Sequence, residues 1–151
     1  MFARSDAAAG LSWTVTASHE LLEMLGDPYV NLSVQIRPDG TAVAYETADA
    51  VESDEFAYTV AGVLVSDFVY PAWFVAGSTG PWDHGGHCTA PLQLLQGGYI
   101  GVWTPGKGWS QVTADGPPRH ANGPRFAMRA QGRGLPQPRE VPAWAGSTLP
   151  A

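Results

Sequence analysis

An alternating segment near residue 30 places the strongest constraint on how this 151-residue chain folds. Apolar and polar side chains alternate there, with the apolar ones at Val30, Leu32, Val34 and Ile36. This period of two is typical of a strand with one buried face. The turn sequence Pro-Asp-Gly follows directly, in which proline fixes φ and glycine tolerates positive φ. We therefore expect residues 41–47 to return as an antiparallel strand.

Further strands are predicted downstream of this hairpin. Residues 56–60 and 63–70 form a second predicted hairpin, with its turn at Ala61-Gly62. Two or three more short strands are expected over 92–103 and 109–113, because β-favouring residues there are interrupted by glycine and proline. The many short strands joined by tight turns indicate antiparallel pairing.

A single short helix is predicted over residues 19–25, preceded by a short strand over 11–15. Thr16 or Ser18 supplies the expected N-cap, and Gly26, followed by Asp-Pro, ends the helix. Helix and strands together predict an α+β fold, in which one motif helix packs on antiparallel β-hairpins.

The length of the chain suits one domain with one buried core. We expect a disordered start over 1–10, a domain over 11–114 and a Pro/Arg-rich tail over 115–151, largely disordered or draped over the body. No signal peptide is visible and no apolar run approaches the ~20 residues of a membrane helix, so no membrane association is expected.

Charge is distributed unevenly along the chain. Residues 1–114 hold 12 acidic and 3 basic residues, a net charge of −9, whereas residues 115–151 hold 2 acidic and 5 basic residues. An acidic body repels phosphate backbones, which argues against nucleic acid as a partner. The basic tail is a candidate docking segment for a protein partner.

The sequence His19-Glu20-Leu21-Leu22-Glu23 is the strongest candidate for chemistry. Side chains four apart lie one above the other on a helix, so His19 and Glu23 can reach the same point. Glu20 lies about 100° further round the helix and can address a water bound to a shared cation. Metalloproteases place His-Glu-x-x-His on a helix for the same purpose, with the glutamate as general base. Here Glu23 replaces the second histidine.

A third ligand has to come from another segment. Asp49 and Glu52, in the acidic stretch after the first hairpin, are the best-placed acids, and Asp27 is a weaker candidate. Zinc accepts carboxylate oxygen as well as imidazole, and a second carboxylate favours harder divalent cations such as manganese or calcium. The expected cofactor is therefore Zn²⁺ or another divalent cation.

Two other groups of residues have alternative interpretations. His84, His87 and Cys88 can bind zinc or form a solvated loop, and the single cysteine favours the loop. Aromatic residues between the short strands can line a groove for sugars or peptides, but burial in the core is the commoner role; they are Trp73, Phe74, Trp82, Tyr99, Trp103 and Trp109.

The segments 12–28, 49–52, 62–74, 97–102 and 108–111 resemble a family of uncharacterised bacterial and phage-encoded proteins, whose HExxE helix is similar to that of zincin-like metallopeptidases. The resemblance covers about residues 12–114 and not the tail. It implies that His19 and Glu23 are metal ligands, that Asp49 or Glu52 is the third, and that Glu20 is the catalytic base. Zincin folds place several strands and a helix before the motif helix, whereas eighteen residues precede His19 here. The expected domain is thus zincin-like but N-terminally short, unless another chain supplies that portion.

Two functions follow as hypotheses. The first is a zincin-like, peptidase-type metallohydrolase acting on a peptide or protein substrate. The second is a non-catalytic structural or binding protein, virion-related, that retains a degenerate metal site. The expected location is cytoplasmic or virion-associated.

Overall fold

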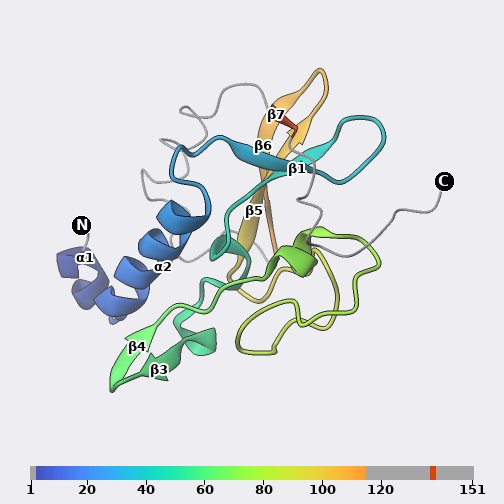
Figure 1. Ribbon diagram of the computed structural model, residues 1–151. Helices are drawn as coiled ribbons and strands as arrows, with labels where there is room; N and C mark the ends of the chain where they lie inside the picture. Colours follow the sequence, from blue (N-terminus) through green and yellow to red (C-terminus); the bar gives the residue numbers. More distant parts are fainter. Residues whose placement is uncertain (1–2, 115–136, 139–151) are drawn as a thin grey trace.

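The structure is a computed structural model that describes residues 3–114 and 137–138 (Figure 1). Helix α1 spans Ala3–Ala8 and helix α2 spans Trp13–Gly26. Five strands form one sheet in the order β6-β5-β2-β1-β7, with bounds β1 Leu32–Gln35, β2 Ala42–Ala44, β5 Tyr99–Thr104, β6 Gly108–Thr113 and β7 Gln137–Pro138. Strands β3 (Tyr58–Val60) and β4 (Val63–Val65) form a separate two-stranded sheet. The α+β class is confirmed.

The predicted hairpins are present. Strands β1 and β2 pair antiparallel, with Val34 opposite Val43, around a turn in which Gly40 has φ 92°. Strands β3 and β4 pair antiparallel across Ala61 and Gly62, both at positive φ, as a primed hairpin turn requires. Each strand is shorter than predicted. Beyond β2 the chain forms a 3₁₀ helix at Asp49–Val51. The side chain of Asp49 reaches His19 on α2.

Helix α2 is twice as long as predicted. The prediction of a strand over 11–15 was wrong, because α2 begins at Trp13. Aromatic and β-branched residues favour a strand there, but tertiary contacts outweigh this weak preference. Ser12 is the N-cap residue of α2, and Val15 is buried on the inner face of its first turn. The Thr14 hydroxyl donates a hydrogen bond to the Leu64 carbonyl (2.6 Å), which attaches the start of the helix to β4.

The N-terminal segment differs from the expectation, and most of the C-terminal tail lies outside the described residues. Where a disordered start was expected over 1–10, α1 forms, because its alanines favour a helix and Asp6 is buried. Residues 115–136 and 139–151 of the tail lie outside the described residues, and the backbone of β7 pairs parallel with Leu32–Ser33. In the part of the chain that the structure describes, no helix is long and apolar enough to span a bilayer.

The core lies between the large sheet and the long loop that follows β4. Its buried members are Val43, Ala50, Val51, Val69, Trp73, Phe74, Cys88, Leu95 and Ile100. Trp73 is completely buried and packs edge-to-face against Phe74, with ring centroids 4.9 Å apart. Core packing, the preferred interpretation of the aromatic residues, therefore holds for these two rings. Trp103 and Trp109 instead pack against each other across β5 and β6, half-buried.

Gly98 holds the loop before β5 against the turn that carries Asp49. A Cβ atom at Gly98 would overlap the Ala50 carbonyl, which already accepts a hydrogen bond from the Leu95 N–H (3.0 Å). We expect Gly98→Ala to lower the free energy of unfolding by about 1–3 kcal/mol, the usual cost of overpacking, in urea denaturation. Gly101→Ala is the control, because the three atoms nearest to its added methyl are side-chain atoms, the Ala44 Cβ at 3.3 Å and two Trp109 ring carbons at 3.7 and 3.8 Å. Equal losses in the two variants would contradict this account.

Candidate metal centre

Helix α2 buries a polar stripe and exposes apolar side chains. Its buried residues are Val15, His19 and Glu23, spaced four apart along one face. Leu21, Met24 and Leu25 are 50%, 57% and 70% exposed. Amphipathic helices usually do the reverse, and a buried imidazole and carboxylate cost free energy unless they are paired. The inner face of α2 is therefore built around a polar contact.

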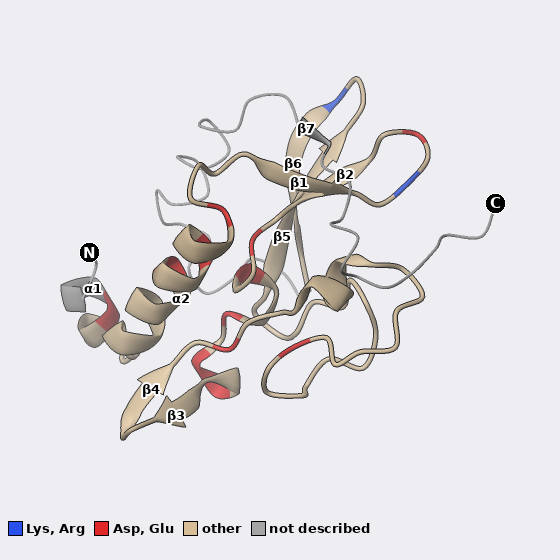
Figure 2. Cartoon of the chain, viewed as in Figure 1, with Lys and Arg blue, Asp and Glu red and all other residues tan. Residues whose placement is uncertain are grey.

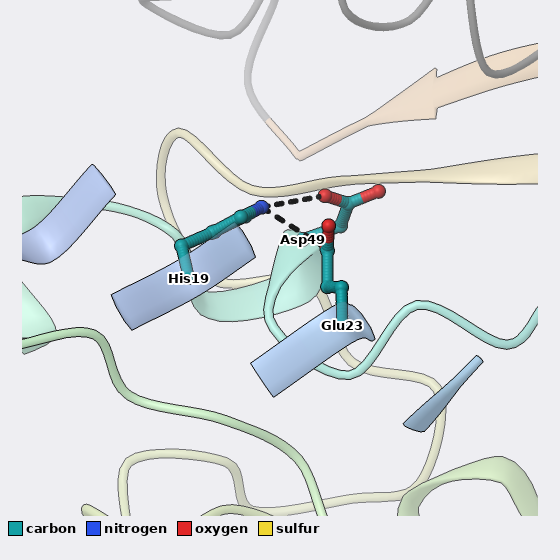
Figure 3. A group of neighbouring side chains, drawn as sticks. All are labelled: His19, Glu23 and Asp49. Carbon is teal, nitrogen blue, oxygen red and sulfur yellow. Dashed lines mark ion pairs between the residues drawn. The ribbon is translucent and has the colours of Figure 1, made fainter. Parts of the chain in front are cut away.

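That contact is with the 3₁₀ turn after the first hairpin. His19 Nε2 lies 3.0 Å from Glu23 Oε1 and 3.2 Å from Asp49 Oδ1 (Figure 3). The three donor atoms lie within 4.8 Å of one another, and His19, Glu23 and Asp49 are only 4%, 3% and 3% exposed. The structure thus brings together one residue pair from α2 and one acid from a segment 26 residues further along the chain.

The pKa values of this group reflect its burial. Burial lowers the pKa of His19, but the neighbouring charges of Glu23 and Asp49 outweigh it and raise that pKa well above its ordinary value. Burial, together with the charge of Glu23, raises the pKa of Asp49 to about 7. Two carboxylates therefore share the neutralising effect of one imidazolium. A divalent cation would replace the proton on His19 and neutralise both carboxylates.

The geometry and composition of the group suit a borderline divalent metal. Zinc binds nitrogen and oxygen at about 2.0–2.2 Å in a tetrahedron, so its ligand atoms lie about 3.4 Å apart. The two separations from His19 Nε2, 3.0 and 3.2 Å, are slightly shorter and need only small side-chain adjustments. One nitrogen and two oxygens also leave one position for water, as in catalytic zinc sites.

Charge around the group also favours a cation. Acidic residues concentrate in α2, the 3₁₀ turns and the neighbouring loops, whereas the basic residues seen in Figure 2 lie at the tips of the β1–β2 and β5–β6 hairpins. Such an arrangement raises the local concentration of positive ions and disfavours anions.

The other acids proposed from the sequence have different positions. Glu52 follows the Asp49–Val51 turn as its C-cap residue, and the converging donor atoms found among the described residues include Asp49 but not Glu52. Glu20 is half-buried beside His19 on α2. Asp27 is buried, but its Oδ2 accepts a hydrogen bond from the Leu32 N–H (2.8 Å) and so fixes the start of β1.

The loop that contains two histidines and the cysteine does not bring these three side chains together. His84 Nδ1 lies 3.1 Å from the Tyr70 hydroxyl, and its ring stacks on Phe68 at 5.2 Å. Cys88 is buried, which raises the pKa of its thiol to about 12. A thiol that stays protonated at neutral pH is a poor metal ligand. The zinc alternative through these three residues is therefore not supported.

Sequence reasoning missed the group that His87 joins instead. Its imidazole turns toward Asp67 and Asp83, which are both completely or almost completely buried. A signal was present, because Asp67 occupies the alternate position between Val65 and Val69 in a strand-like run, where an apolar residue is expected. An acid at an apolar position of such a run predicts a buried carboxylate with a specific partner.

Comparisons of the chain with protein-family models, with curated proteins and with solved structures found no match.

Proposed function

We propose that this protein is a metallohydrolase of zincin type, with one divalent cation, preferably zinc, held by His19, Glu23 and Asp49. The observation that carries the proposal is the convergence of one nitrogen and two carboxylate oxygens within 4.8 Å in a buried setting. It is supported by the orientation of α2, which buries His19 and Glu23 while leaving leucines in solvent. Nitrogen and oxygen donors of this kind are typical of zinc and manganese sites.

The chemistry that this centre would supply is activation of a water molecule. Zinc held by His19, Glu23 and Asp49 would lower the pKa of a bound water toward 7 and would polarise a carbonyl oxygen. Glu20, adjacent to His19, is the proposed base. It accepts a proton as the water oxygen bonds to the carbonyl carbon of a peptide, and it returns that proton to the amine nitrogen when the C–N bond breaks. Two carboxylate ligands make the metal a weaker Lewis acid than a site with two histidines.

A second candidate function is a non-catalytic cation site in a structural or binding protein, virion-related in the hypothesis above. The observation that favours it is burial, because side chains of His19, Glu23 and Asp49 that are at most 6% exposed give a substrate little access. In this role the cation cross-links α2 to the turn after β2 and stabilises the fold.

Replacement of Glu20 separates the two functions. We expect the zinc-loaded protein to cleave fluorescein-labelled casein, and Glu20→Gln to reduce the rate by about 100-fold or more while zinc stays bound, because a general base contributes 10²–10⁴-fold. Glu55→Gln, a change at an exposed acid, is the matched control with unchanged rate. Stoichiometric zinc without hydrolysis in the wild type would leave the non-catalytic function, and a failure to bind zinc, manganese or calcium would remove both.

A further inference from the structure

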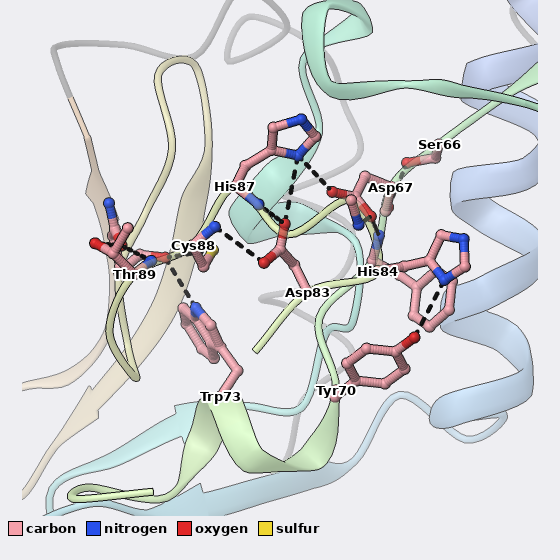
Figure 4. A network of polar contacts seen from close by, with 12 residues as sticks. Ser66, Asp67, Tyr70, Trp73, Asp83, His84, His87, Cys88 and Thr89 are labelled. Carbon is pink, nitrogen blue, oxygen red and sulfur yellow. Dashed lines mark hydrogen bonds and ion pairs between the residues drawn. The ribbon is translucent and has the colours of Figure 1, made fainter. Parts of the chain in front are cut away.

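A second group of donor atoms lies in the loop after β4, outside the proposed centre. His87 Nδ1 lies 3.2 Å from Asp67 Oδ2 and 3.4 Å from Asp83 Oδ2 (Figure 4). Asp67 follows β4, whereas Asp83 and His87 belong to the glycine-rich loop, which a backbone bridge between Val69 and Asp83 holds beside that segment. The three donor atoms lie within 4.8 Å of one another.

Backbone N–H groups hold both carboxylates in place. Asp67 Oδ1 accepts hydrogen bonds from the N–H groups of Phe68 (2.8 Å) and Gly85 (3.0 Å). Asp83 Oδ1 accepts one from the Cys88 N–H (2.9 Å), and Asp83 Oδ2 accepts one from the His87 N–H (2.7 Å). These bonds leave the Oδ2 atom of each aspartate directed at the same imidazole nitrogen. Hydrogen bonds of this kind orient the ligands of metal sites.

The imidazole proton alone accounts poorly for this arrangement. Nδ1 carries at most one proton, which can point to one carboxylate at a time, yet two carboxylates face it. Charge-assisted N–H···O bonds are typically about 2.7–2.9 Å long, shorter than the 3.2 and 3.4 Å observed. Donor atoms around a shared zinc ion lie about 3.4 Å apart. The 3.2 Å contact is within hydrogen-bonding distance, so one proton accounts for Asp67 but not also for Asp83, whereas a shared ion accounts for both separations.

The loop is shaped to keep the ring over the carboxylates. A Cβ atom at Gly85 would overlap the His87 ring and approach Asp67 Oδ2 to 2.7 Å, so only glycine leaves this space. The phenyl ring of Phe56 packs against the His87 ring, with centroids 5.1 Å apart. Asp67 and Asp83 are 0% and 1% exposed, whereas the His87 side chain is 40% exposed, which gives an ion a route from solvent.

We propose that Asp67, Asp83 and His87 form a second divalent-cation site, filled by zinc, that fastens the loop over residues 83–88 to the segment after β4. One imidazole and two aspartates are a donor set that zinc accepts, and solvent supplies the remaining ligand on the exposed side. The ion balances two buried negative charges, which the imidazolium alone would leave incompletely neutralised. This proposal does not depend on the centre at His19, since it uses other residues on other elements.

The test counts zinc ions in the folded chain. We expect native mass spectrometry of the wild type, titrated with zinc, to show two ions per chain. His87→Ala should show one, and His84→Ala, which changes the other histidine of the same loop, should still show two. His19→Ala should lose the other ion and keep the one at His87. Two ions in His87→Ala, or a wild type whose only ion is lost in His19→Ala, would overturn the proposal.

A second measurement needs no variant at this site. In ¹H–¹⁵N spectra of the wild type, zinc should shift the side-chain nitrogen resonances of His87 and leave those of His84 in place. Unchanged His87 resonances at a zinc concentration that fills the first centre would overturn the second site without affecting the first. A shift of the His87 resonances supports it even if the His87→Ala chain is unstable.

Discussion

Removal of zinc with a chelator is expected to lower the melting temperature of the zinc-loaded protein by about 10 °C. An ion that binds only the folded chain stabilises it by about 2.7 kcal/mol when its free concentration is 100 times the Kd. The described body over residues 3–114 lies between the size classes for which this conversion is known, so each kcal/mol corresponds to about 4 °C. The effect is large because His19, Glu23 and Asp49 are buried, so the metal-free protein keeps two carboxylates beside one imidazole in a poorly solvated place.

Differential scanning calorimetry measures this shift. Two comparisons then identify which metal and which site cause it. Added zinc should restore the original melting temperature, whereas magnesium should not, because magnesium dehydrates reluctantly and prefers oxygen ligands in an octahedron. The His87→Ala chain should retain the part of the shift that the ion at the His19 centre contributes, since that centre is intact in it. A melting temperature that chelation leaves unchanged would rule out a stabilising ion at either group.

The helical part of the site was predictable from spacing alone. Positions 19 and 23 lie one turn apart on any α-helix, so the proximity of His19 and Glu23 follows from the sequence once a helix is assumed. The orientation of that face was not predictable. The leucines of α2 indicate an inner face by composition, yet Leu21 and Leu25 are exposed, and the buried face instead carries His19, which contacts Asp49.

The sequence alone could not decide whether Asp49 or Glu52 is the third ligand, because the answer depends on the path of the backbone. A separation of three residues would place both acids on one side of a continued 3₁₀ helix. The helix ends at Val51, and Asp49 enters it with a buried side chain whereas Glu52 lies at its exit, half-buried. Local spacing cannot show where such a short turn ends, because its end depends on the packing of Val51 and Ala50 in the core.

Turn chemistry predicted more of the fold than strand propensity did. Ala61-Gly62 and the Pro-Asp-Gly turn fix two hairpins, because these dihedral angles suit few residues. Residues 11–15 show the opposite case, where β-favouring side chains begin a helix. Asp67 and Asp83 belong to segments 16 residues apart in the sequence, and only the antiparallel bridge beside them brings their carboxylates together. Contacts of that kind are set by tertiary structure.

Substitution of Asp49 by asparagine is expected to weaken zinc binding at the first centre by about 100-fold or more. Changes to residues that only orient a ligand already reduce metal affinity by about 10–100-fold, and a direct ligand should lose at least as much. Asparagine keeps the shape of the side chain and its contact distance to His19 but removes the negative charge. The affinity is measured by competition with a chromophoric chelator in a His87→Ala background, so that one centre is titrated.

Glu52→Gln is the matched control, because it removes one negative charge three residues away, at the exit of the same turn. Long-range attraction of a cation to an acidic surface would fall by a similar amount in both variants and would be screened by salt. Direct ligation predicts that only Asp49→Asn loses affinity, and that the loss persists at high ionic strength, because the group is buried. Equal losses in the two variants would therefore mean that Asp49 attracts the ion without binding it, and the three-residue centre would not stand.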